Sequence, residues 1–403
     1  MSHRALVAGW AVLASACAGG ATNPERVRPG VEVLLTDSVH LVEGRRVGLV
    51  TNQTGVDAAG TSDVDRLLGA GVNLVALFSP EHGFRGVEDQ AVVGHGVDSA
   101  TGLPIYSLYG EVRAPTPVML SGLDVLLVDL QDIGARTYTF VSTMLLAMEA
   151  AGRAGLPVAV LDRPNPIGGE PVQGPVLDPA FASFVGMLPV PLRHGMTAGE
   201  LALMGKAVLG YDVTLTIVPA AAWRRDVWFD ETGLPWVRPS PNMPDLESAT
   251  HYPGLVLFEA TNVSVGRGTP IAFQVIAAPW LDPAAVRAAA GVVPGVALSD
   301  TTIEPAQPTD GKYDGRRLRA VRLQVTARAV YDPVRMAVRL LAALRERHAD
   351  SLVVRARTLD ERAGSAQLRL ALESGIAPDS IWRSWQPALD AFKATRATFL
   401  LYR

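Results

Sequence analysis

The chain has 403 residues, of which 48% are hydrophobic and 19% charged, and its formal net charge is −4. This composition supplies a large apolar core and is unlike that of disordered chains. Lysine and arginine are scattered along the chain, whereas nucleic-acid binding needs a concentrated basic surface, so we expect no nucleic-acid partner. The length predicts two domains.

The N-terminus has the pattern of an export signal. A short apolar run at residues 5–16 follows two basic residues and is too short to span a bilayer. Cys17, the only cysteine, directly follows Ala14-Ser15-Ala16, as in bacterial lipoprotein signals, where the cysteine is lipidated after cleavage. We therefore predict that residues 1–29 are a signal and tether, and that the chain is exported and anchored to the membrane through Cys17. The alternative is an ordinary Ala-x-Ala cleavage site.

Between residues 47 and 162, continuous apolar runs alternate with helix-like segments. The runs at residues 47–50, 74–78, 125–128 and 158–161 are typical of strands buried on both faces of a parallel sheet. Helices are predicted over residues 62–70 and 143–154, each followed by a glycine. This alternation predicts an α/β domain with a doubly wound, mostly parallel sheet.

The C-terminal part has a different pattern. Val321, Leu323 and Val325 alternate with polar residues, which predicts an antiparallel strand with one solvated face. Asp332 and Pro333 then suit the start of a helix, which we expect to end at about residue 347. We place a domain boundary near residue 280, so that residues 30–280 form the larger domain and residues 281–403 a smaller α+β domain.

Polar side chains follow all four apolar runs. The carboxyl ends of parallel strands share one edge of the sheet, and ligands bind outside that edge. We therefore predict a single site there. Its candidate residues from these strand ends are Asn52, Glu81, His82, Gln131, Asp132, Arg136, Tyr138, Arg163 and Asn165.

Later loops add further polar residues between glycines and prolines, which hold such side chains in place. They are His194, Asn242, Glu259, Asn262 and Arg267. Each candidate also has a structural interpretation. His82 is equally suited to a buried hydrogen bond, and Asp132 with Arg136 to an ion pair that holds a loop. Glu200 belongs to a capping box with Thr197, so we interpret it as structural.

Several catalytic motifs do not occur in the sequence. It has no Gly-x-Ser-x-Gly elbow, no His-Glu-x-x-His pair, no phosphate-binding Gly-x-x-x-x-Gly-Lys loop and no Gly-x-Gly-x-x-Gly after the first strand. A lone cysteine also excludes a Cys-based zinc site. We expect neither a metal nor an organic cofactor. The remaining carboxylates, arginines, amides and histidines suit acid–base chemistry on a polar, anionic ligand.

Several longer motifs are distinctive. They are Val50-Thr51-Asn52-Gln53-Thr54-Gly55, Ser79-Pro80-Glu81-His82-Gly83-Phe84-Arg85-Gly86, Asp129-Leu130-Gln131-Asp132-Ile133-Gly134-Ala135-Arg136-Thr137-Tyr138-Thr139, Leu161-Asp162-Arg163-Pro164-Asn165-Pro166 and Pro239-Ser240-Pro241-Asn242-Met243-Pro244. In these motifs the chain resembles a known family, the bacterial exo-β-N-acetylmuramidases. The resemblance runs from about residue 30 to the C-terminus, and it implies a Rossmann-like catalytic domain with a smaller C-terminal domain.

The resemblance implies an exo-acting glycoside hydrolase that releases N-acetylmuramic acid from the non-reducing end of peptidoglycan fragments. Glu81 is then the leading catalytic acid, with His82 and Arg85 in the same motif. The second catalytic role is open between Asp132, Glu259 and the substrate's own 2-acetamido group. The lactyl carboxylate of muramic acid needs a cationic partner, for which Arg85, Arg136, Arg163 and Arg267 are the candidates.

The sequence departs from the family pattern at several positions. The family usually has Gly at Ala260, Glu at Val265 and Glu at Gln274, and residues 92–95 lack its Ala-Gly-Glu triplet. Lost carboxylates beside a site can change the substrate or weaken activity. Two alternatives therefore stay open: a non-catalytic lipoprotein that binds wall sugars, and a hydrolase of another acetamido sugar.

Overall fold

The computed structural model describes residues 26–88 and 93–403. Cys17 and most of the predicted signal segment lie outside these residues. In the part of the chain that is described, no helix is both long enough and apolar enough to cross a membrane.

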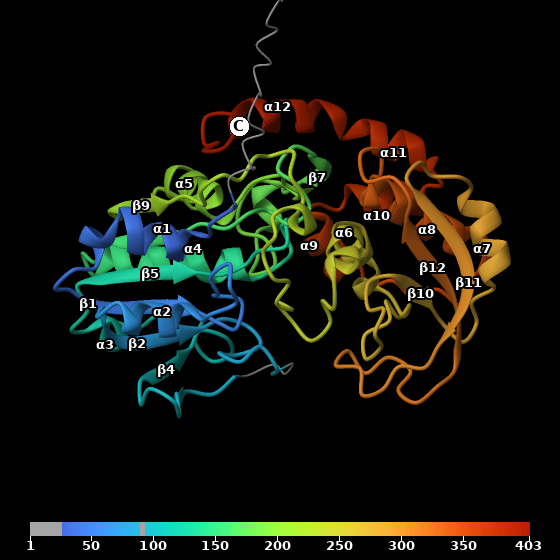
Figure 1. The fold of residues 1–403 in the computed structure, drawn as a ribbon. Helices are drawn as coiled ribbons and strands as arrows, with labels where there is room; N and C mark the ends of the chain where they lie inside the picture. Colours follow the sequence, from blue (N-terminus) through green and yellow to red (C-terminus); the bar gives the residue numbers. More distant parts are fainter. Residues whose placement is uncertain (1–25, 89–92) are drawn as a thin grey trace, which may run out of the picture.

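The larger domain is built on a seven-stranded sheet with the order β3-β4-β2-β1-β5-β6-β9 (Figure 1). Neighbouring strands are parallel except β3, a two-residue edge strand that runs antiparallel to β4. The strand order reverses between β1 and β5, as in doubly wound sheets. The strands are β1 (Arg46–Thr51), β2 (Asn73–Ser79), β3 (Gly96–Val97), β4 (Pro104–Ser107), β5 (Val125–Asp129), β6 (Val158–Leu161) and β9 (Leu215–Val218).

Helices cover both faces of this sheet. On one face Leu34 of α1 (Gly30–Asp37) and Leu67 of α2 (Asp63–Gly69) pack in one cluster with Leu127 of β5. On the other face α4 (Phe140–Arg153) and α5 (Ala198–Leu209) share a cluster with Leu126, the residue of β5 directly before Leu127. Successive strand residues point to opposite faces, so a strand covered on both sides must be apolar throughout. The four predicted strands, the parallel sheet and the fold class are confirmed.

The helix ends follow the capping signals in the sequence. The Ser62 hydroxyl caps α2 by accepting from the Asp65 N–H, and Thr197 and Glu200 form the predicted capping box of α5. Helix α4 begins at Phe140, three residues before the predicted start. Its first turn carries aromatic and β-branched residues, whose low helix propensity is outweighed by the burial of Phe140.

The C-terminal region has its own antiparallel sheet in the order β10-β12-β11. Val321 and Leu323 of β12 are buried, as the alternation predicts, and α8 starts at Pro333 with Asp332 as its cap. Strand β10 lies before residue 280 yet pairs with β12. The elements are β10 (Val275–Ala277), α7 (Pro283–Ala290), β11 (Val296–Ile303), β12 (Leu318–Val325), α8 (Pro333–Arg347), α9 (Ala356–Ala363), α10 (Gln367–Glu373), α11 (Pro378–Ser384) and α12 (Gln386–Arg396).

The two sheets lie at opposite sides of the molecule, and α12 crosses from the C-terminal region back towards the larger domain (Figure 1). Helix α3 (Pro117–Leu120) belongs to the connection from β4 to β5 in the larger domain. Between the two sheets lie the hairpin of β7 (Gln173–Val176) and β8 (Pro191–Arg193), and α6 (Leu246–Leu255) (Figure 1). A single hydrophobic cluster joins both parts, because it contains residues of α4, α6, α8 and α12.

The end of the chain is attached to the larger domain. The Tyr402 hydroxyl donates to Asp162 at the end of β6, at 2.6 Å, and the Leu401 N–H donates to Glu200 at 2.8 Å. The carbonyl of Arg403 accepts from the Arg225 N–H at 3.0 Å. These contacts hold α12 across both parts of the molecule.

Candidate active site

A cavity of about 360 Å³ lies where the loop after β2 and the start of α4 meet loops from the second half of the chain. Its volume falls within the range of about 300–1,000 Å³ that is usual for small-molecule sites. The residues that line it are Glu81, His82, Tyr109, Arg113, Thr137, Tyr138, Thr139, Ser183, Phe184, Val185, Ser240, Met243, Tyr252, Val256, Glu259, Arg267, Phe273, Glu361 and Arg362.

Glu81 and His82 stand on a tight turn directly after β2. His82 has a positive φ of 72°, a conformation that non-glycine residues rarely adopt. Its Nδ1 lies 2.8 Å from the carbonyl oxygen of Glu88. Because a carbonyl only accepts, Nδ1 carries a proton in this contact. Such strained residues gather at functional sites, where the surrounding structure holds them in place.

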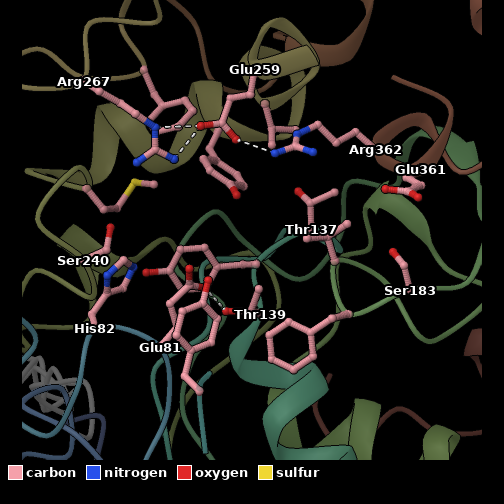
Figure 2. A pocket seen from close by; sticks show the side chains of 18 of the residues that line it. Glu81, His82, Thr137, Thr139, Ser183, Ser240, Glu259, Arg267, Glu361 and Arg362 are labelled. Atoms are coloured by element: carbon pink, nitrogen blue, oxygen red, sulfur yellow. Dashed lines mark hydrogen bonds and ion pairs between the residues drawn. The ribbon is translucent and has the colours of Figure 1, made fainter. Parts of the chain in front are cut away.

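The carboxyl group of Glu81 is held by Thr139, whose hydroxyl makes a short hydrogen bond with Oε2 (Figure 2). Thr139 is the residue directly before α4, so the regular start of this helix fixes the position of its hydroxyl. The resulting wall of the cavity therefore presents a carboxyl group with a defined orientation.

The opposite wall carries a charged cluster of Glu259, Arg267 and Arg362 (Figure 2). Arg267 Nε lies 2.7 Å from Glu259 Oε1, and Arg362 Nη2 lies 3.3 Å from Oε2. Burial alone would raise the pKa of Glu259, but the charges of the two arginines outweigh it and hold this pKa below its usual value. Glu259 is therefore ionised at neutral pH.

Aromatic rings connect the two walls. Tyr138 contacts Tyr252 edge to face with the ring centroids 5.8 Å apart, and Tyr252 contacts Phe273 at 4.8 Å. The guanidinium of Arg267 lies over Phe273. Burial raises the pKa of both tyrosines, so their hydroxyls stay neutral. This row offers a ligand an apolar surface together with neutral hydroxyls.

Five predicted residues, Glu81, His82, Tyr138, Glu259 and Arg267, thus line one cavity. The other predicted arginines do not line it. Arg163 is buried in an ion pair with Asp129, at the reversal point between β1 and β5. Arg85 pairs with Asp98 at 2.7 Å beside a separate cavity.

Arg136 is buried and donates to three backbone carbonyls, those of Pro175, Val190 and Arg362, at 2.7 to 2.9 Å. Its guanidinium therefore braces the segments around the cavity and does not line it.

The predicted amides fix loops at the edge of the cavity or beyond it. Asn52 accepts from the N–H and hydroxyl of Thr54, and Gln131 donates to two backbone carbonyls. Asn165 bridges the backbones of two loops. Asn262 links its own loop to another one by bonding the backbone of residues 351 and 353. Asn242 accepts from the N–H of Gly268, next to Arg267.

Asp132 and His194 contact each other through their side chains. His194 Nε2 lies 3.4 Å from Asp132 Oδ2, and the same oxygen accepts from the Gly134 N–H at 2.7 Å. Both side chains are buried, and neither lines the cavity. Within residues 26–88 and 93–403, no group of three or more histidine, cysteine, aspartate or glutamate side chains is placed to hold a metal ion.

Several lining residues were not predicted from the sequence. Arg113 and Phe184 stack with 4.5 Å between the guanidinium carbon and the ring centroid. Glu361 and Arg362 come from α9, a strongly charged helix whose sequence is typical of a solvated surface. Phe184 belongs to none of the motifs that the sequence analysis used. The charged residues of α9 reach the cavity because this helix packs against the segment around Glu259.

The fold and this cavity define an α/β enzyme with a positioned carboxyl group on one wall and a carboxylate held by two arginines on the other. The chain belongs to the exo-β-N-acetylmuramidase NamZ family. The family's N-terminal domain model matches residues 47–247, and its C-terminal domain model matches residues 250–402. It is therefore a glycoside hydrolase, and the resemblance seen in the motifs is confirmed.

A similar curated protein is the peptidoglycan β-N-acetylmuramidase NamZ of Bacillus subtilis strain 168. It is 40% identical over 383 residues, which cover 94% of this chain and 92% of that protein. Two solved DUF1343 family proteins from Bacteroides fragilis NCTC 9343 share the fold. Each alignment covers 94% of this chain and 99% of the other chain. They are 35% and 30% identical, with TM-scores of 0.86 and 0.76.

Proposed function

We propose that this chain releases N-acetylmuramic acid from the non-reducing end of peptidoglycan fragments, with Glu81 as the catalytic acid. The observation that carries the proposal is the position of the Glu81 carboxyl group. It lines the cavity, is oriented by Thr139, and faces a wall that carries an excess of positive charge. Glycosidic cleavage needs an acid that protonates the leaving oxygen, and an anionic sugar needs cationic partners.

The contacts of the other carboxylates favour the substrate's 2-acetamido group as the second catalytic group. Glu259 is engaged by Arg267 and Arg362, and Glu361 pairs with Arg357 at 2.9 Å. Asp132 lies outside the cavity lining. The acetamido oxygen then attacks the anomeric carbon while Glu81 gives its proton to the departing oxygen. Water afterwards opens the cyclic intermediate and returns a proton to Glu81.

The positions at which the sequence departs from the family pattern support the same substrate class. Ala260, Val265 and Gln274 are buried, and none of them lines the cavity. Gln274 donates 2.7 Å hydrogen bonds to Asp245 and Ser248, so it fills a structural role. These three departures therefore remove no carboxylate from the cavity wall.

The test is turnover of a chromogenic β-N-acetylmuramic acid glycoside, beside its N-acetylglucosamine analogue, by the wild type and Glu81→Gln. We expect turnover of the muramic glycoside, and a fall in kcat of about 10²–10⁴-fold in the variant. Glu149→Gln, at a half-buried position of α4 outside the cavity lining, is the matched control. Binding of N-acetylmuramic acid without hydrolysis would support a non-catalytic protein that binds wall sugars. Turnover of the N-acetylglucosamine glycoside alone would support a hydrolase of another acetamido sugar.

We also propose that the chain is exported and anchored through a lipid on Cys17. The proposal rests on the apolar run before Cys17 and on the small residues that precede it. Expression of the full chain and Cys17→Ala in a bacterium, followed by detergent phase partition, tests it. The wild type should enter the detergent phase and the variant the aqueous phase. Equal partition of the two proteins into the aqueous phase would contradict the anchor.

A further inference from the structure

Three arginines line the cavity, and two of them converge on one carboxylate. Arg267 approaches Oε1 of Glu259 through Nε at 2.7 Å and Nη2 at 2.5 Å, whereas Arg362 reaches Oε2 at 3.3 Å. The third, Arg113, stacks on Phe184. Two guanidiniums on a single ionised carboxylate leave one positive charge in excess in this cluster. Glu361, which also lines the cavity, has its charge balanced by Arg357.

Further contacts increase this positive charge and hold it in place. Arg355 donates to the backbone carbonyl of Glu259, and Arg136 donates to that of Arg362, at 2.7 Å. The side chains of the Glu259 cluster are only 11 to 21% exposed, so water screens their charges weakly. A cationic site that is fixed from behind and partly desolvated binds a carboxylate more strongly than flexible surface arginines do.

Arg362 is the less committed of the two arginines. Its contact with Glu259 is long, and its Nε has no hydrogen-bond partner among the described residues. Arg362 lines the cavity and its side chain is 21% exposed, so its terminal guanidinium nitrogens, and not the buried Nε, are the donors that face a ligand. A second carboxylate beside Glu259 would pair with these nitrogens and neutralise the excess charge.

We propose that Arg267 and Arg362, held apart by Glu259, form the site that recognises the lactyl carboxylate of a terminal muramic acid. This inference rests on the proposed function and names the residues that determine its specificity. Of the four arginines that the sequence offered for this role, Arg85, Arg136 and Arg163 are engaged elsewhere, and Arg362 was not among them. Glu81 lies on the opposite wall (Figure 2). In this proposal the sugar ring spans the cavity, with its lactyl arm towards Arg267 and Arg362.

The first experiment uses the wild-type chain and alters the charge of the ligand. Calorimetry compares N-acetylmuramic acid with its lactyl methyl ester, which keeps the shape and loses the negative charge. We expect the acid to bind about 10- to 100-fold more tightly than the ester. Equal affinities would overturn the proposal, and this comparison needs no variant to fold.

The second experiment removes each guanidinium in turn. Arg267→Met and Arg362→Met should bind the acid and the ester with nearly equal affinity. Arg328→Met is the matched control, because Arg328 pairs with Asp230 at 2.7 Å outside this cavity lining, and it should keep the wild-type preference. An undiminished preference for the acid in both pocket variants would overturn the assignment.

The two proposals fail in different ways. If the wild type prefers the acid but cleaves no muramic glycoside, the carboxylate site stands and the proposed hydrolysis falls. If it cleaves the glycoside and binds acid and ester equally, the hydrolysis stands and the carboxylate site falls.

Discussion

The guanidinium of Arg136 donates a 2.7 Å hydrogen bond to the backbone carbonyl of Arg362, which lies 226 residues further along the chain. Arg136 belongs to the segment that leads into α4, and Arg362 belongs to α9 of the C-terminal region. One side chain next to the Glu81 wall thus fixes the backbone of the opposite wall. This contact directly links the segments that form the two walls of the cavity.

Replacing Arg136 with Met should destabilise the whole chain by several kcal/mol. Three backbone carbonyls would lose their donor, and each buried acceptor without a partner costs about 1–3 kcal/mol. Urea unfolding measures the change, with Arg153→Met on the exposed face of α4 as the control. A loss below about 1 kcal/mol would show that water replaces the guanidinium and that Arg136 is no brace.

Thr139→Val should lower kcat about 10-fold or more while KM changes little. The hydroxyl orients the carboxyl group of Glu81, and hydrogen bonds to charged groups contribute more than neutral ones. Thr139→Ser keeps the hydroxyl and should recover most of the activity. A rise in KM at constant kcat would instead assign Thr139 to substrate binding.

The effect of Glu81→Gln should depend on the leaving group. A dinitrophenolate departs without protonation, whereas a methylumbelliferyl or sugar leaving group benefits from an acid. The ratio of wild-type to variant kcat should therefore be much smaller for the dinitrophenyl glycoside. Equal ratios for both substrates would mean that Glu81 acts in another step.

Asp162 makes stability depend on pH. Burial raises the pKa of Asp162 from its ordinary value of 3.8 to about 6, against the opposing hydrogen bonds from Thr197 and Tyr402. The folded state therefore favours the protonated carboxyl, whose contribution is complete below the unfolded pKa and is lost as pH rises through 6. Between about pH 4.5 and about pH 7.5 this loss amounts to about 2 kcal/mol.

In Asp162→Asn this loss should disappear, because an amide does not ionise in this range. Its oxygen still accepts from the Gly199 N–H, and its NH2 group donates to the hydroxyls of Thr197 and Tyr402. Unfolding in urea at both pH values gives the comparison, with the exposed Asp390→Asn as the control. The same pH dependence in variant and wild type would contradict the assigned titration.

Local patterns predicted the larger domain well, because the forces behind them are local. Continuous apolar runs identify strands that are covered on both faces, and Ser62, Thr197 and Asp332 mark helix starts through their own side-chain hydrogen bonds. The late prediction for α4 has a tertiary cause. Burial of Phe140 extends that helix beyond the limit that its intrinsic propensity sets.

The site was predicted only in part, since a polar residue at a strand end has two possible uses. Glu81 faces the cavity, whereas Arg163 neutralises a buried neighbour, Asp129, and their sequence contexts look alike. Which use applies depends on where the second half of the chain packs. Arg362 could not be predicted for a similar reason. The charged sequence of its helix, α9, is typical of a solvent-exposed surface, and only the packing of α9 beside Glu259 brings Arg362 into the site.

The attachment of residues 401–403 to Asp162, Glu200 and Arg225 also has a consequence for biosynthesis. A ribosome delivers the chain from its N-terminus, so the sheet of the larger domain emerges long before the residues that complete it. Until then Asp162, Glu200 and Arg225 lack these partners, so the larger domain gains its last hydrogen bonds only after the whole C-terminal region has been made.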